Sequence, residues 1–140
     1  MNTGIEAVIK DVNSSLPQRK LIQMVERANM SADMKALLVD LARITVKVAG
    51  KVLSIGRKIL SFVFDIIKLS PTITLGVLAA ITVSALIGSI PILGGVLTAV
   101  LSPLLLAAGV GMGAMKDLTS ERLQTRLDNL IDSFSALKEA

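Results

Sequence analysis

The chain has 140 residues, enough for one domain, and 52% of them are hydrophobic, which gives a mean hydropathy of +0.69. It contains no Cys, His, Trp or Tyr, which excludes disulfides, thiolate chemistry and nearly all transition-metal sites, and argues against base stacking on nucleic acid. The net charge is +4, with the basic excess in the first half, so we expect an anionic lipid surface as partner and no nucleic acid.

Residues 1–30 predict two short helices. Apolar residues spaced along 3–13 indicate a short amphipathic helix, which Ser14 and Pro17 end. A second helix carries Leu21 and Val25. Ser31 is then a suitable N-cap for the next helix.

Residues 31–69 predict one long basic amphipathic helix. Its polar residues recur at steps of three and four, which places them on one narrow stripe of a helix. After Asp40, this polar stripe comprises Arg43, Lys47, Lys51, Ser54, Lys58, Ser61, Asp65 and Lys68.

The polar stripe has three interpretations. The helix could lie on a membrane with its apolar face down and its cations at lipid headgroups. Several copies could instead turn the stripe inward and line an aqueous pore. In a water-soluble oligomer, the stripe would be the wetted face.

Residues 70–115 predict a hydrophobic helical hairpin. No residue from Leu69 to Met115 is charged, and the run is about twice the ~20 residues of one membrane span. We expect helices over 71–90 and 95–115, joined by a turn at Pro91, Gly94 and Gly95. In general kind, without a shared motif, this hairpin resembles the hydrophobic hairpin of pore-forming colicins or of small phage holins.

Small residues recur at four-residue spacing in both apolar segments, which is typical of helices that pack closely in lipid. An ordinary abundance of Gly and Ala in membrane helices is the alternative explanation. The helix-packing candidates are Gly76, Ala80, Ser84, Gly88, Gly95, Ala99, Ala107 and Gly111.

Residues 116–140 predict a C-terminal amphipathic helix. Leu123, Leu127, Leu130, Phe134 and Leu137 alternate steps of four and three. This seam fits a short coiled coil or a helix docked on a neighbour.

These features predict an all-α integral membrane protein with a transmembrane two-helix hairpin. We expect no enzymatic activity, cofactor, metal site or small-molecule substrate, because the chain lacks His and Cys and its carboxylates are scattered. The predicted function is homo-oligomerisation that permeabilises or shapes a membrane. The alternative is a structural scaffold or anchor for a larger complex or a membrane-containing virion. The basic flank predicts a bacterial inner membrane location with both termini cytoplasmic.

Overall fold

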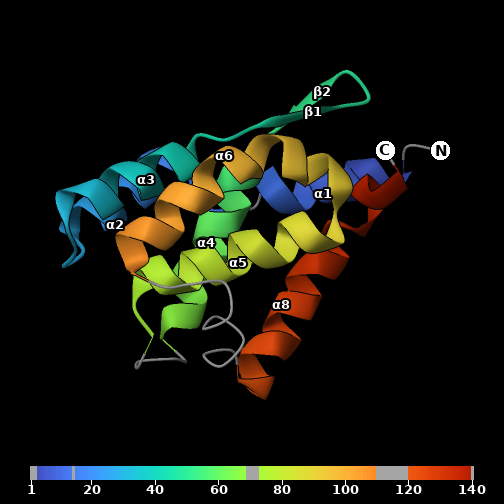
Figure 1. Ribbon diagram of the computed structural model, residues 1–140. Helices are drawn as coiled ribbons and strands as arrows, with labels where there is room; N and C mark the ends of the chain where they lie inside the picture. Colours follow the sequence, from blue (N-terminus) through green and yellow to red (C-terminus); the bar gives the residue numbers. More distant parts are fainter. Residues whose placement is uncertain (1–2, 14, 69–72, 110–119, 140) are drawn as a thin grey trace.

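Helices form most of the chain in the computed structural model, which describes residues 3–13, 15–68, 73–109 and 120–139 (Figure 1). The all-α expectation therefore holds for the bulk of the fold. The α-helices are α1 (Thr3–Asn13), α2 (Gln18–Arg27), α3 (Ala32–Ala42), α4 (Ile55–Ile67), α5 (Leu75–Ser89), α6 (Pro91–Ala108) and α8 (Glu121–Ser133). Two short strands, β1 (Val46–Val48) and β2 (Lys51–Leu53), and a 3₁₀ helix, η1 (Ser135–Glu139), complete the described elements.

Two short helices, α1 and α2, occupy the N-terminal part of the chain, and α3 begins at the expected cap. The Ser31 hydroxyl accepts a hydrogen bond from the backbone N–H of Met34 at 3.2 Å. It satisfies a donor that the first turn of a helix otherwise leaves without a partner.

The prediction of one long helix over 31–69 is wrong. The chain forms α3, then an antiparallel hairpin of β1 and β2, then α4. Ala49 and Gly50 have φ angles of 53° and 77°, as a two-residue hairpin turn of the primed type requires. β-Branched Val46 and Val48 favour strand, and their burial on either side of exposed Lys47 shows the strand period of two.

Gly56 allows α4 to lie close to the end of α3. A Cβ atom at this position would collide with the backbone carbonyl oxygen of Leu41 and lie 3.0 Å from its carbonyl carbon. The backbone N–H of Gly56 also donates to the carbonyl of Ile44 at 3.0 Å, which closes the base of the β-hairpin. The glycine therefore serves a close backbone approach rather than a helix bend.

α5 and α6 form an antiparallel helical hairpin, but its turn differs from the prediction. The chain reverses at Ile90, whose backbone is extended with φ −128°, and Pro91 begins α6. Gly94 and Gly95 lie inside α6 and not in the turn, so this part of the prediction is wrong. Proline suits the first position of a helix, where its missing N–H is not needed. The remainder of the predicted second segment, 110–115, lies outside the described residues.

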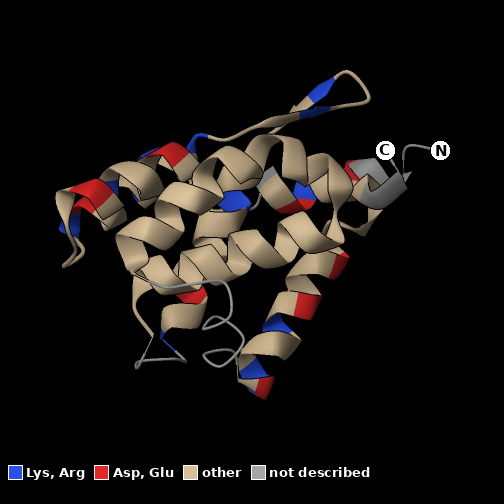
Figure 2. Cartoon of the chain, viewed as in Figure 1, with Lys and Arg blue, Asp and Glu red and all other residues tan. Residues whose placement is uncertain are grey.

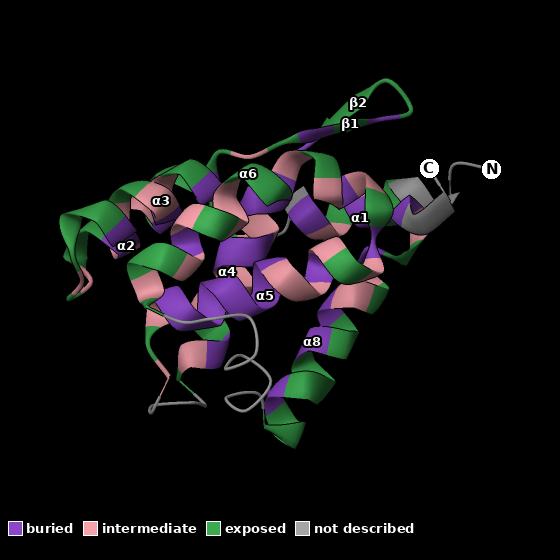
Figure 3. Cartoon of the chain, viewed as in Figure 1, coloured by how far each residue is buried: buried purple, intermediate pink, exposed green. Residues whose placement is uncertain are grey.

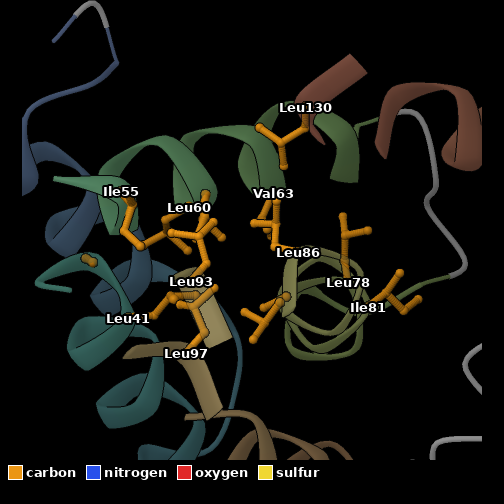
Figure 4. Close-up of a cluster of buried hydrophobic side chains, with 14 of the residues drawn as sticks. Leu41, Ile55, Leu60, Val63, Leu78, Ile81, Leu86, Leu93, Leu97 and Leu130 are labelled. Atoms are coloured by element: carbon orange, nitrogen blue, oxygen red, sulfur yellow. The ribbon is translucent and has the colours of Figure 1, made fainter. Parts of the chain in front are cut away.

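α5 lies at the centre of the molecule (Figures 1 and 3). Every residue from Gly76 to Val83 is buried, and α3, α4, α6 and α8 contact this helix. Side chains from several elements converge in the core, among them Leu60 and Val63 of α4, Leu86 of α5 and Leu130 of α8 (Figure 4).

The leucine seam of the C-terminal segment docks on the molecule itself. Leu123, Leu127 and Leu130 are buried as α8 packs against α4 and α5, and Phe134 and Leu137 are fully buried beyond it. The leucine spacing predicted either a short coiled coil or a helix docked on a neighbour, and the structure has the docked helix. η1 then contacts α1, which brings the two ends of the chain together.

Replacing Gly56 by Ala should destabilise the fold by about 1–3 kcal/mol, because the added methyl group meets the Leu41 backbone rather than a side chain that could move aside. Urea unfolding followed by circular dichroism measures this change. Gly88→Ala is the matched control, since a Cβ at Gly88 meets nothing within 4 Å. It should leave stability unchanged or raise it by up to about 1 kcal/mol. Equal effects of the two variants would contradict the close-approach role.

Candidate membrane-contacting surface

α6 is an uncharged helix of 18 residues with well-defined ends. Pro91 occupies its first turn, and Gly109 ends it in the left-handed conformation with φ 69°. Glycine is common at this position because it has no Cβ to strain the backbone. The helix is about 27 Å long at 1.5 Å per residue. This length is close to the ~30 Å hydrocarbon thickness of a bilayer.

One side of α6 packs against the molecule. Leu93, Leu97 and Leu104 are the buried residues, and their spacing places them on one side of the helix. Six more apolar residues of the helix are half-buried against the core: Ile92, Val96, Val100, Leu101, Leu105 and Ala108. The exposed residues of α6 therefore lie mainly on one side of the helix (Figure 3).

The outer side of α6 lacks the charged face that a surface helix normally presents to water. Leu106 is 84% exposed, the highest value for a large hydrophobic residue among those described. The hydroxyl of Thr98 donates to the carbonyl oxygen of Gly94 within the same helix, so it needs no water. The exposed residues of the helix are Pro91, Gly95, Thr98, Ala99, Ser102, Leu106 and Ala107.

α6 is the one described helix that is long and apolar enough to cross a membrane. α5 is also apolar but has 15 residues, and it is enclosed by other helices. Its hydroxyl at Thr82 is buried and donates to the carbonyl of Leu78 at 2.8 Å. The two helices of the hairpin thus share a composition but differ sharply in exposure.

The two rows of small residues do not face each other. On α5, Gly76 and Ala80 are buried, Ser84 is half-buried and Gly88 is exposed. A Cβ at Gly76 would collide with the side chain of Met34 on α3, so this end of the row packs inside the molecule.

On α6, the described members of the row, Gly95, Ala99 and Ala107, are exposed. A Cβ at Gly95 would meet nothing within 4 Å. This row therefore lies on the outer side of α6 and does not form the α5–α6 contact. Gly111 lies outside the described residues.

Charged residues lie on the other elements and leave α5 and α6 uncharged (Figure 2). The polar stripe does not share one helix face, because the β-hairpin interrupts it. Arg43 caps the end of α3, Lys47 and Lys51 lie on the β-hairpin, and all three are exposed. Asp65 and Lys68, at the end of α4, are exposed too.

The middle of the polar stripe holds α4 against the N-terminal helices. Ser54, Lys58 and Ser61 are half-buried. The Lys58 ammonium lies 3.0 Å from the Asp11 carboxylate on α1, and the Ser61 hydroxyl accepts from the backbone N–H of Leu16 at 3.3 Å. In this fold, Lys58 and Ser61 thus make structural contacts within the chain.

Arg57 makes the most extensive of these contacts, although it lies beside the polar stripe and was no site candidate. Its guanidinium donates to the carbonyl of Leu16 at 3.1 Å and to that of Ser15 at 2.9 Å. These carbonyls belong to the connection between α1 and α2. No periodic signal in the sequence could indicate this role, because the partners are backbone atoms more than forty residues away.

Described residues line two cavities that open at the surface. One, of about 500 Å³, lies between the first turns of α3 and the last turns of α6 and is lined by Asp33, Ala36, Leu37, Pro103, Leu106 and Ala107. The other, of about 210 Å³, lies between α4 and α8 and is lined by Lys58, Phe62, Asp65, Ile66, Arg126, Asn129, Leu130 and Ser133. Among the described residues, no group of three metal-ligating side chains could hold a metal ion.

Comparisons with protein-family models, with curated proteins and with solved structures found no match to this chain. The surface of α6 must therefore be interpreted from its own chemistry.

Replacing Arg57 by Ala should lower the free energy of unfolding by about 1.5–3 kcal/mol, the usual contribution of hydrogen bonds made by a charged group. Thermal or urea unfolding in buffer measures the change. Lys47→Ala removes an exposed cation from the β-hairpin and should change stability by no more than about 0.5 kcal/mol. An Arg57 variant as stable as the Lys47 variant would show that the contacts with the α1–α2 connection contribute little.

Proposed function

We propose that this protein binds membranes through α6, inserts the α5–α6 hairpin, and homo-oligomerises to permeabilise or shape the bilayer. The observation that carries the proposal is the exposed outer side of α6, an uncharged helix of bilayer length in which three of eighteen residues are buried and seven are exposed. A contiguous apolar surface of this kind marks an interaction site, and lipid matches its length and its lack of charge.

Insertion requires α5 to leave the helices that surround it. The apolar sides of α4 and α8 would lose their contact with α5, but lipid tails are as apolar as the side chains that they would replace. Both helices are amphipathic, with Val63 and Leu127 on their buried sides and charged residues elsewhere. They could therefore lie in the interface with their apolar sides toward lipid.

The direction of insertion depends on charge. Lys68 precedes the uncharged hairpin and Lys116 comes after it, so the hairpin can enter the bilayer while both ends of the chain stay on the side of approach. The turn at Ile90 and Pro91 carries no charge that would have to cross. Cytoplasmic termini in a bacterial inner membrane are part of this proposal.

Oligomerisation would use the small-residue row on the outer side of α6. Gly95, Ala99 and Ala107 are exposed in the single chain. In lipid, small residues four apart let a helix of a second copy approach closely. The anionic lipid surface and a second copy of this chain are thus the two partners that the proposal requires.

Replacing Ala99 by Lys tests insertion. Ala99 is exposed near the middle of α6, so the substitution should leave the soluble fold intact. A cation at the bilayer centre costs about 2.5–3.5 kcal/mol, and we therefore expect at least about tenfold lower dye release from liposomes. Thr125→Lys on the exposed side of α8 is the matched control, since it adds the same charge and should retain release. Equal release by both variants would contradict insertion of α6.

Wild-type protein that binds vesicles without releasing dye would instead favour the structural alternative, a scaffold or anchor for a larger complex or a membrane-containing virion.

Replacing Gly95 by Leu tests assembly. The side chain would project from the outer side of α6 and separate helices that meet there. Amine cross-linking in vesicles should show loss of oligomers, while circular dichroism and vesicle binding should remain unchanged. Thr98→Leu adds bulk on the same exposed helix outside the small-residue row and should retain the oligomers. Cross-linked oligomers of unchanged size in the Gly95 variant would exclude this row as the interface.

A further inference from the structure

The β1–β2 hairpin projects beyond the helical body (Figure 1). Val46 pairs with Leu53, Lys47 with Val52, and Val48 with Lys51, so the two lysines flank the Ala49–Gly50 turn from opposite faces of the ribbon. The turn residues are uncharged and exposed. One face of the ribbon packs on the core through Val46, Val48 and Leu53, whereas the other face, with Lys47 and Val52, is exposed.

The charge around this hairpin is one-sided. Between Asp40 and Asp65 the chain has five cations, Arg43, Lys47, Lys51, Arg57 and Lys58, and no acidic residue. Arg57 and Lys58 are occupied by the α1–α2 connection and by Asp11. Within the described residues, the side chains of the other three make no hydrogen bond or ion pair.

An exposed apolar residue accompanies these cations. Val52 is 62% exposed, on the same outward face of the ribbon as its pairing partner Lys47. A valine beside lysines at the end of a projecting ribbon matches the lipid interface, where ammonium groups meet phosphates and apolar side chains enter the headgroup layer.

The hairpin emerges beside the exposed helix. The first turns of α3 and the last turns of α6 line one groove, so these two helices run in opposite directions. The end of α3 therefore lies at the first half of α6, where Leu41 meets Leu93 and Leu97 (Figure 4). The hairpin begins four residues after α3 ends. The hairpin thus follows directly on the end of α3 that packs against α6.

We propose that the β1–β2 hairpin is a headgroup-binding finger that contacts an anionic bilayer end-on, with Lys47 and Lys51 at phosphate level and the uncharged turn between them. This inference rests on the proposed function, because it supplies the first contact that precedes insertion of α5 and α6. It also decides between the headgroup and pore interpretations for these two lysines: they bind lipid headgroups and do not line a pore.

The binding partner of the finger is lipid rather than nucleic acid, since the finger has no aromatic residue for stacking and carries exposed Val52.

The test is a charge-matched comparison of vesicle binding. The double variant Lys47→Gln/Lys51→Gln should bind vesicles of three parts phosphatidylcholine to one part phosphatidylglycerol about 30-fold more weakly, at about 1 kcal/mol for each lost cation. Arg19→Gln/Lys20→Gln on α2 removes the same charge from exposed positions away from the finger and should weaken binding less than threefold. On vesicles of phosphatidylcholine alone, the two variants should behave alike. Equal losses on anionic vesicles would show that only net charge matters and would overturn the proposal.

A second variant tests the shape of the finger at constant charge. Gly50→Val places a β-branched residue at φ 77°, which strains the turn while every cation remains. With the helical signal in circular dichroism unchanged, we expect at least about threefold weaker binding to the anionic vesicles. Binding equal to wild type would overturn the role of the ribbon. Loss of binding to a DNA duplex that exceeds the loss on vesicles would assign the lysines to nucleic acid and equally overturn it.

The two proposals fail separately. If the finger variants bind normally while Ala99→Lys abolishes dye release, the finger is excluded and insertion stands. If wild-type protein releases no dye but the finger variants lose vesicle binding, insertion is excluded and the headgroup contact stands.

Discussion

The burial of α5 is the constraint on which the rest of the structure depends. This helix has no charged residue, and its buried residues run without interruption from Gly76 to Val83, so it must be covered on all sides. α3, α4, α6 and α8 provide that cover. Its buried hydroxyl, Thr82, is satisfied by the backbone of the same helix, and no other polar residue in the described part of the chain is buried. The coat around α5 can therefore be purely apolar, because α5 presents nothing that needs a polar partner.

The same requirement leaves α6 exposed. A chain of 140 residues has limited surface with which to cover two uncharged helices, and α3, α5 and η1 cover only part of α6. α6 contributes one row of leucines, Leu93, Leu97 and Leu104, to the core, is half-buried on either side of this row and leaves its outer side to solvent. In water this exposure is unfavourable, and in a bilayer it is not. α5 is enclosed and α6 is exposed on its outer side, and both are apolar. Both helices could therefore exchange protein neighbours for lipid, which connects this fold with the proposed membrane activity.

The polar stripe shows how a correct pattern can lead to a wrong element. Steps of three and four between polar residues fit one continuous helix, yet they fit equally well two helices separated by a short ribbon. Two glycines decide between these structures through contacts that are distant in sequence. Gly50 adopts a positive φ in the turn, and Gly56 touches the backbone of Leu41. As a result the cations divide into two sets: Arg57 and Lys58 hold the N-terminal helices, whereas Lys47 and Lys51 project from the body.

Local signals in the sequence determined the helical class, the Ser31 cap, the leucine seam of the C-terminal helix and the uncharged hairpin, because each depends on residues within a few turns of one another. The sequence also identified the cations that precede the two apolar segments, each about as long as a membrane span. Only the tertiary structure decided which apolar helix is enclosed and which is exposed. α5 and α6 have nearly the same composition and neither has a polar side, so no pattern within them distinguishes core from surface. The difference arises from α4 and α8, which pack on α5 and leave the outer side of α6 uncovered.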